Sequence, residues 1–391
     1  NTSGVRGEVG KAISNGLLES PAIIRSHGGR ARAIEEGSLK IDVAFLGAPA
    51  CDRLGNMTGV IGNTACGALG YAMVDARYAR HVIAITDNLV DYPLSPKISI
   101  PQYLVDQVVV VDSIGDPAKI ATGATRITKD PLQLYIAELA FKVIKASGYL
   151  KNDCSFQTGG GGPSLAVARY MRDYMKANSI KGSYCIGGIT GYMADMLKDG
   201  LFKTLFDVQS FDAAVTDSIL HNPNHMEVDS SWYANPFNKG CLVNDLDVVV
   251  LAALDVDVDF NVDVLTGHDG ILRGASGGHS DTAAGAKLSL ITIPSMRNGV
   301  PSIRERVQTV VTPGETVDVI VTERGISVNP KREDLMARLK DSGIPIKDIH
   351  KLKEDIESIT GIPDEVPFED EIVGVVEYRD GTIIDSIRKI K

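Results

Sequence analysis

The sequence lacks long hydrophobic runs and runs of basic residues, and each absence excludes a class of protein. No apolar stretch approaches the roughly 18 residues that a membrane-spanning helix needs, so a transmembrane protein is excluded. No run of five or more Lys or Arg occurs, and 40 basic against 50 acidic residues give a net charge of −10. A nucleic-acid partner is therefore not expected.

Cysteine and aromatic residues are also scarce. The five cysteines form no CxxC pair, and an odd number argues against a disulfide framework or a zinc ribbon. We expect a cytoplasmic protein without a metal site. Aromatic residues make up 6% of the chain, whereas glycine occurs 39 times, which is above average usage. Many glycines predict tight turns and ligand sites lined by backbone.

The chain begins Asn-Thr-Ser-Gly, without Met and without a signal-peptide pattern. We therefore expect that its natural start is missing. From there, short β-branched runs at 41–46, 82–86 and 108–111 predict strands of a parallel sheet covered on both faces. Helix-like segments at 11–18 and 67–79 lie between or before them. This order indicates an α/β domain.

A stretch rich in Gly, Ala and Thr at 113–129 has no clean period and predicts a linker, so we expect domains at 1–129 and 130–391. The turn Arg379-Asp380-Gly381 between two β-branched runs predicts a hairpin. Two successive α/β units also leave room for a distant internal duplication. The other elements expected in the second unit are helices at 132–147, 164–176, 332–339 and 347–358 and strands at 182–186, 248–254 and 317–322.

Four glycines, Gly159 to Gly162, stand before a proline and a helical pattern. Converging backbone N–H groups at such a helix start can hold a phosphate or an oxyanion. The run is not a P-loop, because no GK[ST] follows, and Leu165 stands where a dinucleotide motif needs its third glycine. A plain turn between strand and helix is the alternative.

A second glycine-rich loop, 273–281, carries a cation, an imidazole and a carboxylate. Gly274 to Gly278 formally matches GxSxG, but no full helix separates Ser276 from the next apolar run, so we reject a serine hydrolase. The loop suits close backbone approach to an anionic ligand, or is a structural turn.

Three other polar groups are weaker candidates. Asp255, Asp257 and Asp259 alternate with apolar residues and are expected on a solvated strand face. His221 and His225 flank a proline, which makes a helical metal site improbable, so a loop that lines a pocket is the alternative. Cys51 follows a predicted strand, and a passive thiol is the commoner role for such a residue.

Four motifs occur in the order seen in the CoA-transferase superfamily: DVAFLGAPACDRLGNMTG, QTGGGGPSLAVARYM, TGHDGILRGASGGHSDTAAGAK and VDVIVTERGI. Nearly the whole chain resembles the alpha subunits of citrate lyase. The resemblance implies two CoA-transferase-like domains with mainly parallel sheets. Because chains of this family begin with a further segment, the first domain is expected to be truncated at its N-terminus.

The resemblance also implies the reaction, which exchanges acetyl for citryl on a pantetheine-type thiol and releases acetate. The thiol belongs to a CoA-like prosthetic group on an acyl carrier protein, the gamma subunit, with acetyl-CoA as a surrogate and no permanently bound cofactor. A lyase beta subunit and an oligomeric assembly are further expected partners. Many CoA-transferases use a Glu as a covalent carrier, but the comparable stretch 187–193 has none. We therefore expect a mixed anhydride formed with both substrates bound.

Site residues follow from the two glycine loops and from the negative charge of citrate. The expected oxyanion donors and catalytic residues are Gly160, Gly161, Gly162, Gly277, Gly278 and His279. The expected substrate contacts, with cationic groups foremost, are Arg273, Arg324, His27, His279, Tyr192, Ser276 and Asn235. The prosthetic group is expected at Gly159, Ser164, Gly188 and Gly191. A non-catalytic pantetheine-binding subunit and a thioester hydrolase on the same fold remain alternatives.

Overall fold

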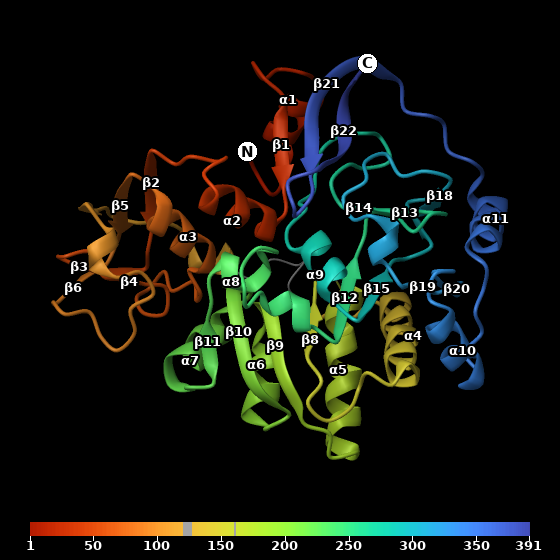
Figure 1. Ribbon diagram of the computed structural model, residues 1–391, viewed down its shortest axis with the longest axis horizontal. Helices are drawn as coiled ribbons and strands as arrows, with labels where there is room; N and C mark the ends of the chain where they lie inside the picture. The colour runs from red at the N-terminus through yellow and green to blue at the C-terminus, as the bar shows by residue number, and fades with distance from the viewer. Residues whose placement is uncertain (120–126, 160–161) are drawn as a thin grey trace.

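The computed structural model describes residues 1–119, 127–159 and 162–391 (Figure 1). Its largest element is an eight-stranded sheet of order β11-β10-β9-β8-β12-β15-β19-β20. All described pairings in it are parallel except β19 with β20. The strands are β8 (Phe156–Thr158), β9 (Gly182–Ile189), β10 (Phe202–Ser210), β11 (His225–Glu227), β12 (Val248–Ala252), β15 (Leu288–Thr292), β19 (Val319–Thr322) and β20 (Gly325–Val328).

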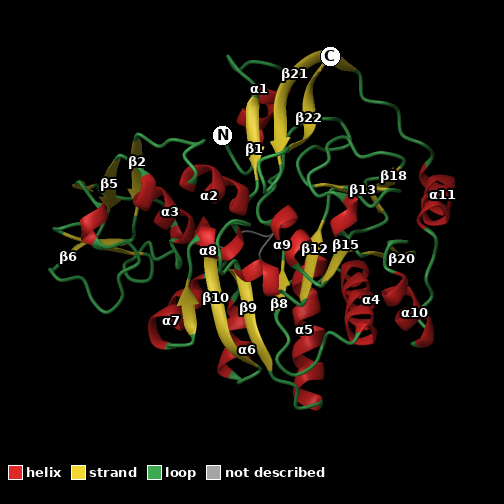
Figure 2. Ribbon diagram, viewed as in Figure 1, coloured by secondary structure: helices red, strands yellow, loops and turns green. Residues whose placement is uncertain are grey.

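Helices cover both faces of this sheet (Figure 2). Residues of β12 alternate between two hydrophobic clusters: Val248 and Val250 pack with α4 (Pro131–Ser147) and α5 (Gly162–Ala177), and Val249 packs in the second cluster. That second cluster holds residues of α8 (Ser230–Ala234), α9 (His279–Gly285) and α11 (Ile349–Thr360). Continuous apolar strands buried on both faces are what a covered parallel sheet requires.

Capping residues explain where several of these helices begin. Asp130 is the N-cap of α4 and accepts a hydrogen bond from the Leu132 N–H at 2.9 Å. Asp229 does the same for α8 through the Trp232 N–H at 2.7 Å. Each cap satisfies one of the unpaired N–H groups of a first turn. The predicted second unit thus starts at a helix boundary.

The first unit has a three-stranded parallel sheet, β2-β5-β7, and a smaller sheet, β4-β3-β6. It repeats an arrangement of the second unit, where β12, β15 and β19 stand beside the small sheet β14-β13-β18. The strands are β2 (Val43–Gly47), β3 (Ala50–Asp52), β4 (Met57–Thr58), β5 (His81–Thr86), β6 (Leu89–Val90), β7 (Gln107–Val110), β13 (Asp255–Asp257), β14 (Val262–Asp263) and β18 (Ile303–Arg304).

Matching hydrogen bonds support this duplication. Asp52 accepts from the N–H groups two and four residues later, and so does Asp257. Asp106 accepts from the N–H of Val82 at 2.7 Å, and Asp318 from that of Ser289 at 2.8 Å. The internal duplication that the sequence left open is therefore present in the fold.

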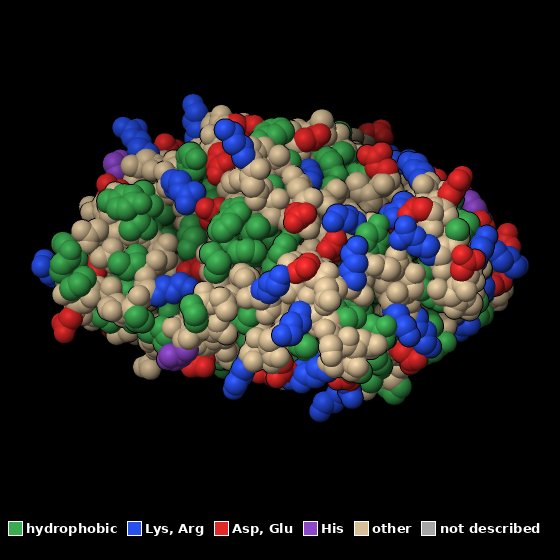
Figure 3. Space-filling model, turned by 60° about the horizontal axis from the view of Figure 1, so that its bottom comes forward, with side chains coloured by type: hydrophobic (Ala, Val, Ile, Leu, Met, Phe, Trp, Pro, Cys, Tyr) green, Lys and Arg blue, Asp and Glu red, His purple; other side chains and the backbone are tan. Residues whose placement is uncertain are grey.

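The expectation that the strands of the first unit are buried on both faces is wrong. Phe45 and Val43 on β2 are 66% and 42% exposed, whereas Val250 and Val248, at the corresponding positions of β12, lie under α4 and α5. Among the described residues no helix covers this face of β2. Figure 3 shows hydrophobic side chains gathering over the left half of the molecule, the end at which Figure 1 places β2.

The two ends of the chain share a third sheet. β1 (Ala22–Arg25) pairs in parallel with β21 (Phe368–Glu377), which forms a hairpin with β22 (Ile383–Ile390). The predicted hairpin is confirmed, and the pairing joins segments from either side of the predicted boundary at 129, which stays a prediction. Part of the predicted linker, 120–126, lies outside the described residues.

One predicted helix is displaced. The segment expected at 11–18 is α1 (Gly7–Ser14), which ends before Gly16 because that residue has a left-handed backbone, with φ +67°. No helix among the described residues is long and apolar enough to cross a membrane. The remaining elements are α2 (His27–Glu35), α3 (Gly70–Tyr78), α6 (Gly191–Lys198), α7 (Ala213–His221), α10 (Glu333–Asp341), β16 (Met296–Arg297), β17 (Val300–Pro301), η1 (Gln102–Leu104), η2 (Pro117–Lys119), η4 (Leu242–Asp245) and η5 (Gly314–Thr316).

Candidate active site

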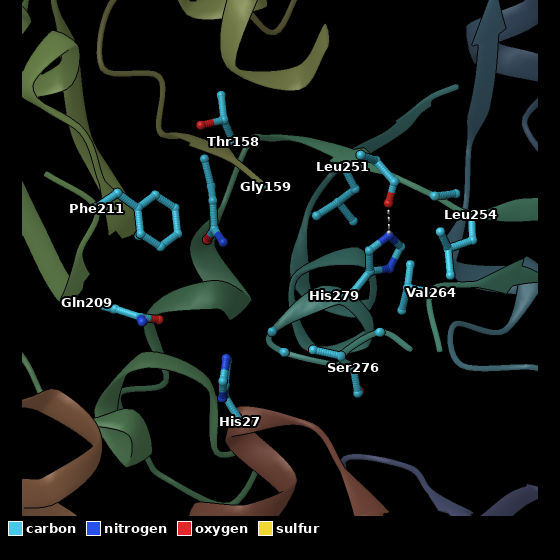
Figure 4. Close-up of a pocket in the computed structure, with 18 of the residues that line it drawn as sticks. His27, Thr158, Gly159, Gln209, Phe211, Leu251, Leu254, Val264, Ser276 and His279 are labelled. Atoms are coloured by element: carbon cyan, nitrogen blue, oxygen red, sulfur yellow. Dashed lines mark hydrogen bonds between the residues drawn. The ribbon is translucent and has the colours of Figure 1, made fainter. Parts of the chain in front are cut away.

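A cavity of about 450 Å³ lies at the carboxyl ends of β8, β9, β10 and β12 (Figure 4). This is the edge at which α/β sheets bind ligands. The second glycine loop forms one wall, and α2 and α3 contribute one side chain each. The lining residues are Arg6, His27, Tyr71, Gln157, Thr158, Gly159, Gly188, Gln209, Phe211, Tyr233, 251–254, Val264, 273–279 and Arg297.

The charged side chains that line the cavity are all of one sign. Among the described residues, three arginines and no carboxylate line it. Arg273 forms an ion pair with Asp269, outside the cavity. Arg297 donates to the Ala253 carbonyl at 2.7 Å, and burial lowers its pKa. Neither Arg297 nor Arg6 has an acidic partner within 4.0 Å among the described residues, so the cavity favours an anion.

His27 begins α2 and lies across the cavity from the strand ends (Figure 4). Its backbone N–H donates to the Gly277 carbonyl at 2.8 Å, and its ring packs against Tyr71 with 4.3 Å between centroids. Burial, with a smaller contribution from Arg30, lowers the pKa of His27 to about 4. His27 is therefore neutral at pH 7.

His279 has both ring nitrogens in contact with the protein. Nε2 lies 3.1 Å from the Ala252 carbonyl and Nδ1 lies 2.7 Å from Thr312 Oγ1. A carbonyl only accepts, so Nε2 carries the proton and Nδ1 accepts from the threonine hydroxyl. Burial lowers the pKa of His279 to about 4. The expectation that His27 and His279 supply positive charge is therefore wrong at pH 7; the arginines supply it.

Behind His27, the buried carboxylate of Asp281 holds the start of α2. It accepts from Ser26 Oγ at 2.7 Å and from the Gly28 N–H at 2.9 Å, and Arg379 Nε lies 3.7 Å away. Burial raises the pKa of Asp281 to about 6, although Arg379 opposes this. Asp281 thus links α9, α2 and the C-terminal hairpin at one point of the site.

Glycines shape the floor by leaving space for neighbouring side chains. A Cβ on Gly188 would lie 2.1 Å from the Phe211 ring, and one on Gly187 would lie 2.7 Å from the Gln157 carboxamide. A Cβ on Gly278 would lie 2.5 Å from Tyr233 Oη. Such distances leave no room for any other residue without movement of the floor.

Eight of the predicted site residues meet in this cavity: Gly159, Gly188, Arg273, Ser276, Gly277, Gly278, His279 and His27. The roles predicted for these residues stay predictions. Gly160 and Gly161 lie outside the described residues.

The other predicted residues do not line the cavity. Arg324 follows β19 and donates to Ser295 Oγ at 3.2 Å, and Tyr192 on α6 lies under Arg172. Asn235 donates to Glu35 at 2.7 Å, and Ser164 donates to the Gly159 carbonyl at 3.0 Å. Gly162 begins α5, and Gly191 begins α6, where its N–H donates to Asp212 at 2.7 Å.

Several lining residues were not predicted. Gln157 and Thr158 stand directly before the glycine run, so their position beside it was a signal. Arg6 precedes α1 and Arg297 lies on β16, far apart in the sequence, and no local pattern marks them. The remaining lining residues that were not predicted are Tyr71, Gln209, Phe211, Tyr233, 251–254, Val264, Gly274 and Ala275.

None of the weaker polar candidates lines this cavity, but His221 and His225 line a separate one, as the loop alternative predicted. Asp255 and Asp257 are buried, not on a solvated face: Asp255 pairs with Arg304 at 3.0 Å, and Asp257 accepts N–H groups of the turn that follows it. His225 is buried beside Asp207, whereas His221 is exposed. No group of three or more His, Cys, Asp or Glu that could hold a metal ion occurs among the described residues.

Comparison with known proteins decides the family. Residues 1–390 match the family model described as citrate lyase, alpha subunit (CitF). The chain belongs to the citrate lyase alpha-subunit family. It is 52% identical over 390 residues to the citrate lyase alpha chain of Klebsiella pneumoniae and 49% identical to that of Escherichia coli strain K12. All of this chain is covered, together with 77% and 76% of those chains. As a member of this family, the chain is a transferase.

Solved structures agree with this membership and with the fold. The alpha subunit of citrate lyase from Streptococcus mutans, solved in complex with citrate, matches with a TM-score of 0.97 and 53% identity over 100% of this chain and 77% of that one. A malonate decarboxylase hetero-tetramer from Pseudomonas matches at 0.59 and 16% identity over 93% of this chain and 79% of that one. A 4-hydroxybutyrate CoA-transferase from Porphyromonas gingivalis matches with a TM-score of 0.53 and 16% identity, over 85% of this chain and 79% of that one. The last two likenesses establish the CoA-transferase-like α/β fold alone.

Proposed function

We propose that this chain exchanges acetyl for citryl on the pantetheine-type thioester of an acyl carrier protein, in the cavity between α2 and the strand ends. The observation that carries the proposal is the lining itself, which has three arginines and no carboxylate in the part of the chain that the structure describes. Citrate brings three carboxylates, and a relative at 53% identity was solved with citrate. The CoA-like prosthetic group arrives on the carrier protein, and a lyase subunit receives the product.

The chemistry needs no protein nucleophile. A citrate carboxylate oxygen attacks the acetyl thioester carbonyl, and the tetrahedral oxyanion collapses with loss of the thiolate to give an acetyl–citryl anhydride. The thiolate then attacks the citryl carbonyl, and acetate leaves. Neither Glu nor Asp is among the described residues that line the cavity, which supports direct transfer between two bound substrates over a covalent glutamate.

Both tetrahedral states need N–H donors where the oxyanion forms. Among the glycines of the two loops, the Gly159 N–H is occupied by the Val250 carbonyl at 2.7 Å and the Gly277 N–H by the Ser3 carbonyl at 3.4 Å. The Gly278 N–H has no partner among the described residues. We therefore assign Gly278 as the main oxyanion donor of this loop.

The test is an exchange assay with acetyl-CoA and citrate. We expect citryl-CoA and acetate in equal amounts, and no acyl-glutamate after treatment with hydroxylamine or borohydride. Acetate release without citrate would indicate a hydrolase, and binding without turnover a scaffold subunit. Arg297→Ala should lower kcat/KM for citrate at least tenfold, while Arg80→Ala, which changes an exposed arginine elsewhere, should not.

A further inference from the structure

Two neighbouring side chains at the cavity floor leave one acceptor and one donor unpaired. Gln157 and Tyr233 both line the cavity and are only 5% and 2% exposed. Gln157 Nε2 donates to Tyr233 Oη at 2.8 Å. Gln157 Oε1 is buried and has no hydrogen-bond partner among the described residues. The Tyr233 hydroxyl accepts that one bond and donates to no described group.

The surrounding glycines fix both groups in place. The Gln157 carboxamide lies against Gly187, where a Cβ would stand 2.7 Å from Nε2, and Tyr233 Oη lies against Gly278. Burial raises the pKa of Tyr233 above its ordinary value, so the hydroxyl keeps its proton and can donate. The pair therefore presents a fixed acceptor next to a fixed donor.

The order of acceptor and donor restricts the ligand. A carboxylate alone offers only acceptors and would leave Gln157 Oε1 unpaired. A carbon that carries both a hydroxyl and a carboxylate offers one donor and one acceptor side by side. A buried polar atom without a partner costs stability, and a ligand group that pairs with it recovers that loss.

We propose that Gln157 and Tyr233 bind the 2-hydroxycarboxylate group of the substrate, with the hydroxyl donating to Gln157 Oε1 and the carboxylate accepting from Tyr233. This inference rests on the proposed function, and it assigns to these two residues the selection of a hydroxy tricarboxylate over a plain one. The arginines of the wall bind the other carboxylates. The amide N–H groups of a pantetheine arm are the other possible donors to Gln157.

The test compares citrate with propane-1,2,3-tricarboxylate, which has the same skeleton without the hydroxyl. With acetyl-CoA as acyl donor, we expect the wild-type kcat/KM to favour citrate by tenfold or more. Gln157→Leu should reduce that preference at least tenfold, almost entirely through loss of activity on citrate. Tyr233→Phe removes the hydroxyl with little change of shape and should reduce the preference as well.

Gln209→Leu is the matched control, because Gln209 is an exposed amide at the same cavity. This variant should change kcat/KM for citrate and for propane-1,2,3-tricarboxylate by the same factor. The inference would be overturned if Gln157→Leu lowered kcat/KM equally for both acids with an unchanged thermal midpoint. A Gln157→Leu variant in which only the KM for acetyl-CoA rises would overturn it as well. If the wild type forms no citryl thioester, the proposed function fails, and calorimetric titration of the same variants with the two acids decides the inference separately.

Discussion

Replacing Asp281 with Asn tests how the start of α2 is held beneath His27. The folded protein raises the pKa of Asp281 from 3.8 to about 6. Between those pH values the folded state holds a proton that the unfolded state has lost, so the contribution of this carboxyl to stability falls as the pH rises through the window. About two pH units correspond to a loss of about 3 kcal/mol.

Asp281→Asn cannot titrate and so lacks this loss. The stability of the variant relative to wild type should therefore rise by about 3 kcal/mol between pH 4 and pH 7, whatever the effect of replacing the acceptor of the Ser26 hydroxyl or the Gly28 N–H by an amide. With an unfolding entropy of about 2.1 cal/mol/K per residue, this corresponds to about 4 °C in Tm.

The assay is thermal unfolding of both proteins at pH 4.5, 5.5, 6.5 and 7.5. His27 and His279, whose pKa values are lowered to about 4, make both proteins less stable as the pH falls below about 6.5, but this effect cancels in the difference between them. A Tm difference that stays constant across the series would refute the raised pKa and the role of burial in it.

Three further changes test the packing. Gly188→Ala should lower the exchange activity by tenfold or more, since its Cβ would stand 2.1 Å from an aromatic ring of the floor, whereas Gly47→Ala meets nothing within 4 Å and should leave the activity unchanged in the same assay. Glu377→Gln should lower the free energy of unfolding by about 3–5 kcal/mol, because it removes a buried carboxylate shared by Arg25 and Arg32, of which Arg32 keeps its ion pair with Glu36. Glu8→Gln in an exposed pair should cost less than about 1 kcal/mol. Phe45→Lys should reduce self-association, measured by light scattering, without lowering the Tm. An unchanged particle size would show that the exposed apolar face of β2 does not mediate self-association.

Periodicity predicted the α/β class, the helix that became α4 and the C-terminal hairpin, because those signals are local. It could not distinguish β2 from β12, since both are short apolar runs and only the second has α4 and α5 against it. The same holds for Asp257, which looks like part of a polar face in sequence. In the fold it is buried because turn N–H groups converge on it.

For the site, too, local patterns could be predicted from the sequence and contacts between distant segments could not. The two glycine loops could be recognised because glycine runs are local patterns. Arg297 and Tyr233 could not be recognised, because they reach the cavity only through the packing of β16 and α8, which are distant in sequence from the glycine loops. Charge was also misassigned: histidines near an anionic ligand look cationic in sequence, but burial removes the proton from His27 and His279 at pH 7.

The internal duplication relates the loop before α9 to the loop before α3, and of these two only the loop before α9 lines the cavity. Its counterpart before α3 docks on the large sheet: a Cβ on Gly67 would lie 1.9 Å from Ser210 Oγ, and the Ala68 and Leu69 N–H groups donate to Ser210 and Glu227 at 3.1 and 2.5 Å. N–H groups used for docking cannot bind a ligand. The docking instead places α3 so that Tyr71 packs on His27, and the first unit thereby forms part of the wall of a cavity built mainly by the second.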